Sequence, residues 1–216
     1  MLGEILAALR RGYILDRWRD MRVVLIPKLG RNLIQTKNWR PLNLMNCVGK
    51  LGEKVAAGKI QGQGESVLHD QQFGSVRSRS AIDVLYKSVM EVRKCLKDMG
   101  SLGWAFWDVK GGFQNVRSAQ ELARMAGCGP LQCWNTWLER LMSLREFKVA
   151  WDGKVRRRGT AHQGVRQRSP LSPFLFLVYM APILEKIEQH VKEEVGRVTV
   201  RFPSYMNDLH CGLYDK

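Results

Sequence analysis

The chain has 216 residues, of which 45% are hydrophobic, and its formal net charge is +15, from 35 Lys and Arg against 20 Asp and Glu. This length and apolar content exclude a wholly disordered chain and allow one domain, or two small ones, with a real core. The charge fits a soluble basic surface, or it indicates a polyanionic partner, meaning nucleic acid or an anionic membrane.

The first segment, the apolar runs and the cysteine spacing give no indication of export, of a membrane span or of a zinc site. The first segment lacks the cleavage pattern of a signal peptide, and no apolar run approaches the ~20 residues of a membrane span. No CxxC pair or zinc-like Cys/His spacing occurs among the five cysteines, so we expect reduced thiols. We therefore predict an intracellular protein, nuclear or cytoplasmic, without a membrane partner. The cysteines are Cys47, Cys95, Cys128, Cys133 and Cys211.

Hydrophobic periodicity predicts a mixture of helices and strands in the first half of the chain. We expect, in order, a helix over 2–18, a buried strand over 22–28, a polar loop over 29–44 that ends in the extended stretch "RPLNL", and helices over 48–60 and 80–100.

The second half continues the alternation. We expect a strand over 103–110, helices over 118–127 and 130–143, a β-hairpin over 147–159 with Asp152-Gly153 at its turn, a helix over 169–194, and two strands within 198–214 around residues 206–208. Without internal repeats or low-complexity segments, these elements indicate an α+β fold.

Two acids stand at predicted strand ends. Asp108 closes an apolar strand, and Asp208 lies at a tight turn between two strands. Such acids converge if their strands are neighbours, and a converged pair binds hard divalent cations through oxygen. Either acid alone is better explained as a solvated strand end.

Five segments resemble, in order, the motifs of reverse transcriptases. The variety they resemble is that of non-LTR (LINE-type) retrotransposons. The resemblance runs from about Val23 to Tyr214, through the stretches "VVLIPKLGRN…NWRPLNL", "QFGSVRSRSAIDVL", "FWDVKGGFQNV", "HQGVRQRSPLSPFLFLVYMAPIL" and "SYMNDL".

This resemblance implies a right-hand polymerase architecture. We expect fingers and palm subdomains, with an antiparallel palm sheet flanked by helices, in a single reverse transcriptase domain fragment over 1–216. Residues 19–102 would be mainly fingers and 103–216 mainly palm, with the two interleaved. The chain ends eight residues after Asp208, so we expect the thumb to be missing.

The resemblance also implies a metal site that binds Mg²⁺ or Mn²⁺. Asp108 and Asp208 would be its acids, and the carbonyl of Val109 would be a further ligand. Asn207 stands where the family has the first acid of its Asp-Asp pair. An amide oxygen brings no negative charge, so we expect weaker metal binding and an impaired chemical step.

The remaining site residues would contact nucleotide and nucleic acid. Lys28 and Arg40 would bind the triphosphate, and Phe113 would screen the 2′-hydroxyl. Gln167 and Ser169 would line the nucleotide pocket. Tyr205 would face the primer end and Arg168 the template, so the implied partners are an RNA template, a DNA primer and deoxynucleotides. Without the resemblance, Lys28 and Arg40 read as solvated loop charges and Phe113 as core.

Several positions depart from the family pattern besides Asn207. Arg168 replaces a glycine that lets the backbone approach nucleotide and template, and a long cation there should crowd the pocket. The other departures are Val76, Arg77, Gly112, Gln114 and Arg166. Their clustering at functional positions favours a degenerate copy. The alternatives to an active enzyme are a basic remnant that binds nucleic acid without catalysis and a relic without function.

Overall fold

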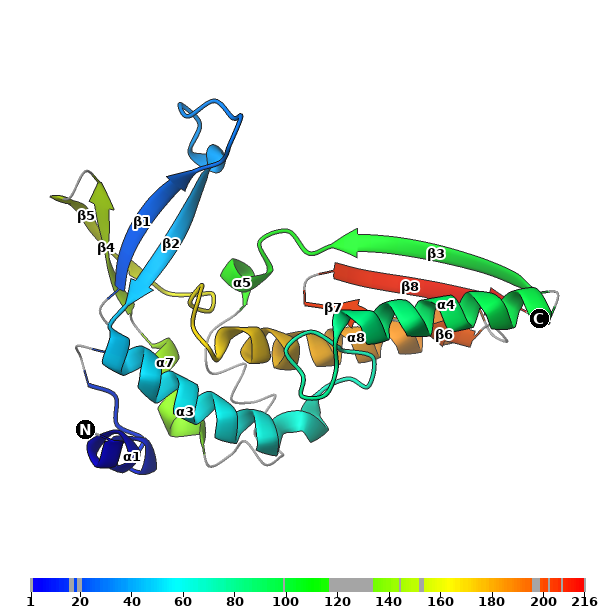
Figure 1. Cartoon of the computed structure of the whole chain (residues 1–216), viewed down its shortest axis with the longest axis horizontal. Helices are drawn as coiled ribbons and strands as arrows, with labels where there is room; N and C mark the ends of the chain where they lie inside the picture. Colours follow the sequence, from blue (N-terminus) through cyan, green and yellow to red (C-terminus); the bar gives the residue numbers. More distant parts are fainter. Residues whose placement is uncertain are drawn as a thin grey trace. The chain divides into compact units, whose positions relative to one another are not determined.

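The computed structural model describes residues 2–15, 18, 21–98, 100–116, 134–143, 145–151, 154–195, 199–201, 203–206 and 208–215. Its internal contacts divide the chain into two compact units (Figure 1). Unit 1 comprises Met1–Gly62 and Phe113–Ser172, and unit 2 comprises Gln63–Gly112 and Pro173–Lys216.

Unit 1 contains a four-stranded mixed sheet. Its strands are β1 (Met21–Pro27), β2 (Trp39–Met45), β4 (Arg145–Trp151) and β5 (Lys154–Ala161), in the order β2-β1-β4-β5. β1 pairs antiparallel with β2 and parallel with β4, and β4 pairs antiparallel with β5. The predicted strand, extended segment and hairpin are therefore confirmed. The hairpin's predicted turn residues lie outside the described part of the chain.

The helices of unit 1 surround an apolar core. They are α1 (Leu2–Arg10), α3 (Cys47–Gly64) and α7 (Asn135–Met142), with a short helix η1 (Thr36–Asn38) before β2 and α5 (Gly112–Asn115) at the boundary between the units. Ile5, Ile14, Ile60, Trp137 and Leu138 are almost fully buried. The helix predicted over 48–60 is confirmed. The one predicted over 118–127 lies outside the described residues, as do the first four residues of 130–143.

The first helix is shorter than predicted. It was expected to run to residue 18, but it ends at Arg10, and Gly12 follows with a φ of +63°. The Gly12 N–H donates to the Leu9 carbonyl at 3.1 Å, and the Tyr13 N–H donates to the Ala8 carbonyl at 2.8 Å. This is the bonding pattern of a Schellman cap, in which a glycine in the left-handed region closes the helix. The apolar periodicity concealed that stop.

Unit 2 contains an antiparallel sheet, as predicted. The sheet has the order β3-β8-β6, with β7 also paired to β8. Its strands are β3 (Ser101–Asp108), β6 (Thr199–Arg201), β7 (Ser204–Tyr205) and β8 (Asp208–Asp215). The helices of unit 2 are η2 (Glu65–Val67), α4 (Ala81–Lys97) and α8 (Ser172–Val195). The first residue of α8 belongs to unit 1. In Figure 1, α4 and α8 run along this sheet.

The helix expected over 80–100 ends at Lys97 and the strand expected over 103–110 runs over 101–108, and two further differences in unit 2 lie at prolines. The two strands expected within 198–214 are three, because the buried Pro203 has no N–H to donate and separates β6 from β7. The last helix begins at Ser172 and not at Ser169. Pro170 disfavours helical backbone at Ser169, and the Ser172 N–H donates to the Ser169 carbonyl at 3.3 Å, so a turn precedes the helix.

The start of α8 forms the core of unit 2. Phe174, Leu175, Phe176, Leu177 and Val178 are all buried, so this stretch is covered on every side. Among the described helices, none is both long and apolar enough to cross a membrane.

Candidate active site

Asp108 and Asp208 lie directly opposite each other at one end of the sheet in unit 2. They are the last register pair of β3 and β8, and both side chains are exposed. Residues opposite each other on antiparallel strands have Cβ atoms about 4.5–5.5 Å apart, and like charges at such positions are destabilising. A divalent cation bound at these two positions would offset the repulsion expected between like charges in this register.

A tight turn precedes Asp208. Tyr205 pairs with Asp208 across β7 and β8, so two residues join the strands, and Met206 has a φ of +58°. Positive φ at the first position is typical of the two-residue turns that join paired strands. Asn207, the second residue of this connection, lies outside the described residues. The Tyr205 side chain is 38% exposed.

The segment 71–75 supports this turn from the side. The Phe73 N–H donates to the Ser204 carbonyl at 2.9 Å, and the Ser204 N–H donates to the Gln71 carbonyl at 2.8 Å. A Cβ at Gly74 would lie 2.7 Å from the Met206 nitrogen, so only glycine allows this approach. Two of the sequence segments that resemble family motifs are thus docked on each other.

A buried polar chain fixes the 69–72 segment on α8. The Gln72 side chain donates to the Leu177 carbonyl at 3.0 Å, and its oxygen accepts from the His69 N–H at 2.9 Å. His69 Nδ1 accepts from the Gln71 N–H, which leaves Nε2 to donate to Glu188 at 2.9 Å. Burial raises the pKa of Glu188, but hydrogen bonds from Lys192 and His69 outweigh it, and the pKa lies below its usual value.

The groups near Asp108 include oxygen ligands of the type that hard divalent cations prefer. They are the two carboxylates and the carbonyl of Val109, which also accepts from the Gly112 N–H at 3.2 Å. Among the described residues, no group of three or more His, Cys, Asp or Glu side chains gathers in one place. Within the described residues the candidate set therefore holds two acids, and Asn207, the further position expected from the sequence, lies outside them.

Unit 1 carries a basic cavity of about 580 Å³, with Lys28, Lys37 and Arg40 in its lining. Lys28 Nζ donates to the Lys37 carbonyl at 2.8 Å. Of the residues predicted to bind nucleotide, Lys28, Arg40 and Gln167 lie together here. Lys37 was missed, although it stands three residues before Arg40 in the same stretch. The other lining residues are Thr36, Trp39, Pro41, Leu42 and Gln114.

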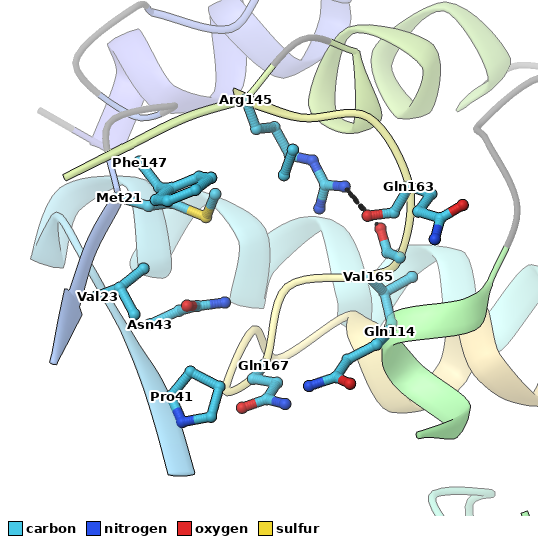
Figure 2. Close-up of a pocket in the computed structure, with 12 residues that line it drawn as sticks. Met21, Val23, Pro41, Asn43, Gln114, Arg145, Phe147, Gln163, Val165 and Gln167 are labelled. Carbon is cyan, nitrogen blue, oxygen red and sulfur yellow. Dashed lines mark hydrogen bonds between the residues drawn. The ribbon is translucent and has the colours of Figure 1, made fainter. Parts of the chain in front are cut away.

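A second cavity, of about 310 Å³, adjoins the first (Figure 2). Pro41, Gln114 and Gln167 line both cavities. Arg145 forms part of its wall and donates to the carbonyls of Gln163 at 2.9 Å and Gly164 at 2.7 Å. Burial, and then the nearby Arg166, lower the pKa of Arg145 to about 10.

Ser169 was predicted to line the nucleotide pocket, but it lines neither cavity. It is buried and donates a short hydrogen bond to Glu53. Arg166 Nη1 also binds Glu53, at 3.0 Å, within the same buried cluster. Burial raises the pKa of Glu53 although Arg166 opposes the shift. Sequence reasoning treated Arg166 only as a departure, and the distant partner at Glu53 gave no signal.

Phe113 and Arg168 lie on the backbone that borders these cavities. Phe113 is half-buried, and its carbonyl accepts from the Val165 N–H at 2.7 Å, but it is not among the residues that line either cavity. Arg168 is exposed and has a φ of +68°, in the left-handed region that favours glycine. The left-handed backbone at this position therefore explains why the family pattern has a glycine there.

Comparison with known proteins decides the family. The sequence profile described as "Reverse transcriptase (RNA-dependent DNA polymerase)" matches residues 26–214, most of the chain. The chain belongs to the reverse transcriptase family. This confirms the assignment made from the five motifs.

The relatives that match are products of transposable elements. The chain is 27% identical over 210 residues to "Retrovirus-related Pol polyprotein from type-1 retrotransposable element R2" of Popillia japonica, covering 93% of this chain and 28% of that protein. It is 22% identical over 179 residues to "Probable RNA-directed DNA polymerase from transposon BS" of Drosophila melanogaster, covering 82% and 20%. The reverse transcriptase segment thus spans between a fifth and a third of these relatives.

A solved structure supports the fold. The structure of apo telomerase from Candida tropicalis, truncated from its C-terminal domain, matches with a TM-score of 0.59 at 12% identity, over 94% of this chain and 45% of that one. At this identity the likeness concerns the fold alone. The expected polymerase-like α+β architecture is confirmed at that level.

Proposed function

We propose that the chain is the polymerase segment of a retrotransposon reverse transcriptase and that this copy is impaired in catalysis. The observation that carries the proposal is the pairing of Asp108 with Asp208 at the sheet end. Two carboxylates on directly opposite strand residues offer the oxygen ligands that suit a divalent cation.

In this proposal, Asp108, Asp208 and the Val109 carbonyl would hold Mg²⁺ or Mn²⁺. When bound, such an ion would neutralise charge on the transferring phosphoryl group. Tyr205, exposed beside Asp208, would contact the primer end.

The basic cavity of unit 1 would bind the triphosphate. A cavity with two lysines and an arginine in its lining offers both point charges and a planar fork for phosphate oxygens. Gln167, from the same lining, would contact the nucleotide, and Phe113 would screen its 2′-hydroxyl. The template would be RNA and the primer DNA.

The impairment would arise from Asn207 and Arg168. Asn207 brings no charge to a site for which the described residues supply two acids, and lower ligand charge weakens the binding of hard cations. Arg168 places a long cation beside Gln167, where the family has a glycine. Of the two, Asn207 is the direct lesion in the chemistry.

Primer extension on an RNA template with Mn²⁺ and deoxynucleotides tests this proposal. We expect no extension by the unmodified chain, extension by Asn207→Asp, and none by Asn207→Asp combined with Asp108→Asn. Extension by the unmodified chain would contradict the impairment. If neither Asn207→Asp nor Asn207→Asp combined with Arg168→Gly extends the primer, although both are folded, the proposed lesions are contradicted.

A second candidate function is nucleic-acid binding without catalysis. The net charge of +15 favours it, because phosphate contacts by Lys and Arg supply sequence-independent affinity. Retention of RNA that weakens steeply with salt, by a chain that stays inactive even as Asn207→Asp, would support this candidate over the first.

A further inference from the structure

We propose that strand β5 is a docking surface for single-stranded nucleic acid, which it guides over Trp151 toward the basic cavity. This surface, the arginine strand, consists of Lys154, Arg156, Arg157 and Arg158. The inference rests on the proposed function, because it names the surface by which the template would approach the nucleotide site.

The arginine strand is an exposed concentration of charge. All four of its cations are exposed, and β5 contains no acidic residue. Within the described part of the chain, the three arginines form neither ion pairs nor side-chain hydrogen bonds with other residues. Arginine presents a planar fork of donors that matches phosphate geometry, so these side chains are available for a polyanion.

The backbone increases the exposure of these charges. β5 is an outer strand of the sheet, with β4 on one side only (Figure 1). Val149 pairs with Arg157 and Ala150 with Val155, so Arg156 is an extra residue at a β-bulge. A bulge interrupts the strict alternation of side chains and re-aims them. The opposite strand adds to the repulsion, since Lys148 lies directly across from Arg158.

An aromatic platform joins the arginine strand to the basic cavity. Trp151 pairs with Lys154 at the turn end of the hairpin and is 44% exposed. Its ring packs edge-on against Trp39, with the ring centroids 4.8 Å apart, and Trp39 lines the basic cavity. Cations that follow a backbone beside exposed aromatic rings are typical of surfaces that bind single strands, because unpaired bases stack on the rings.

A different role for these charges is protection of the sheet edge. Charged residues on an outer strand prevent edge-to-edge association of sheets. That role does not require Trp151, and it predicts that removing the charges increases aggregation while RNA affinity stays the same. Phosphate binding predicts a change in the salt dependence of affinity, so one titration separates the two.

The test compares two variants of equal charge by fluorescence anisotropy on an unstructured oligouridine, over a series of KCl concentrations. One variant changes Arg156, Arg157 and Arg158 to Gln. The control changes Arg93, Lys94 and Lys97, exposed cations on α4, to Gln. Thermal unfolding of both confirms that they fold.

Each phosphate contact to a single strand contributes about 0.7 to the slope of log K against log salt concentration, where K is the association constant. We therefore expect loss of the three arginines to make this slope about 2 less steep. That change corresponds to a loss of affinity on the order of a hundredfold at 0.1 M salt. The α4 control should keep the slope of the unmodified chain. Trp151→Ala should weaken binding about five- to hundredfold without changing the slope, and Trp151→Phe should restore most of it.

Equal salt slopes for the two triple variants would overturn the proposal. So would an affinity of the unmodified chain for a blunt DNA duplex that equals its affinity for oligouridine. Failure of the unmodified chain to bind oligouridine would also overturn it. These outcomes leave the proposed function standing if Asn207→Asp extends a primer. Conversely, a silent polymerase with a β5-dependent slope would contradict only the proposed function.

Discussion

At the scale of single residues, the strained backbone at Arg168 predicts a gain in stability from one substitution. A non-glycine residue in the left-handed region costs roughly 1–2 kcal/mol, and Arg168 has a φ of +68°. We expect Arg168→Gly to raise the free energy of unfolding by about 1 kcal/mol in urea denaturation. Arg168→Ala removes the charge but keeps Cβ, and it should bring no such gain. If the two behave alike, the strain is not the cause.

Gly164 predicts the opposite effect. Its φ is +83°, and a Cβ there would lie 2.8 Å from the Gln114 carbonyl oxygen. Gly164→Ala should therefore lower the free energy of unfolding by more than about 2 kcal/mol. Gly58 in α3 has open space around it, and Gly58→Ala should be neutral or raise stability by up to about 1 kcal/mol. Equal effects at the two glycines would contradict the packing described here.

The positions of individual site residues could be predicted from the sequence where a local pattern determines them. Asp108 and Asp208 were expected to converge because each stands at a strand end, and they do. Ser169 was placed in a pocket by motif position alone, and its bond to Glu53 depends on a contact 116 residues away. No local pattern encodes such a partner.

At the scale of elements, α4 illustrates a boundary set by local chemistry. Ser80 accepts from the Asp83 N–H, and the Asp83 carboxylate accepts from the Ser80 N–H, forming a capping box. Ser80→Ala should cost about 1 kcal/mol of stability, whereas Ser80→Asn should retain most of it, because Asn also caps. Thermal unfolding followed by circular dichroism measures both. A loss common to both variants would argue against the cap.

The contact of α8 with the 69–72 segment predicts a pH dependence. The pKa of Glu188 is lower in the folded chain than its usual value near 4.5, so Glu188 stabilises the fold above that value. This stability is lost as the pH falls below about 4.5 through the folded pKa. Glu188→Gln should flatten this part of the profile of unfolding midpoint against pH. Glu185→Gln, an exposed control on the same helix, should not.

Elements were predictable where periodicity and turn residues agreed, as in α4 and the hairpin of β4 and β5. Element ends were less predictable. α1 ends at Arg10 because Gly12 forms a cap that apolar periodicity does not reveal, and Pro203 separates β6 from β7. The sequence contains both residues that set these ends, a glycine and a proline. The apolar pattern around each of them nevertheless predicted a continuous helix or strand.

At the scale of the whole molecule, the sequence predicted the antiparallel sheet of unit 2 but not the pairing of β1 with β4. That pairing joins residues 21–24 to residues 147–150, which are so distant in the sequence that no local pattern reports it. It also brings the hairpin into the sheet that carries the basic cavity. The family could be inferred from motifs within the sequence, whereas the second cavity and the position of the arginine strand at the sheet edge depend on the fold.

In the proposed function, Asp108 and Asp208 form a cation site that Asn207 weakens. Terbium luminescence tests it most directly, because Tb³⁺ takes the same oxygen ligands as other hard cations and the exposed Trp107 lies next to Asp108. We predict weak sensitised emission from the unmodified chain, at least tenfold tighter binding by Asn207→Asp, and loss of emission in Asp108→Asn. Equal affinity in all three proteins would contradict the claim.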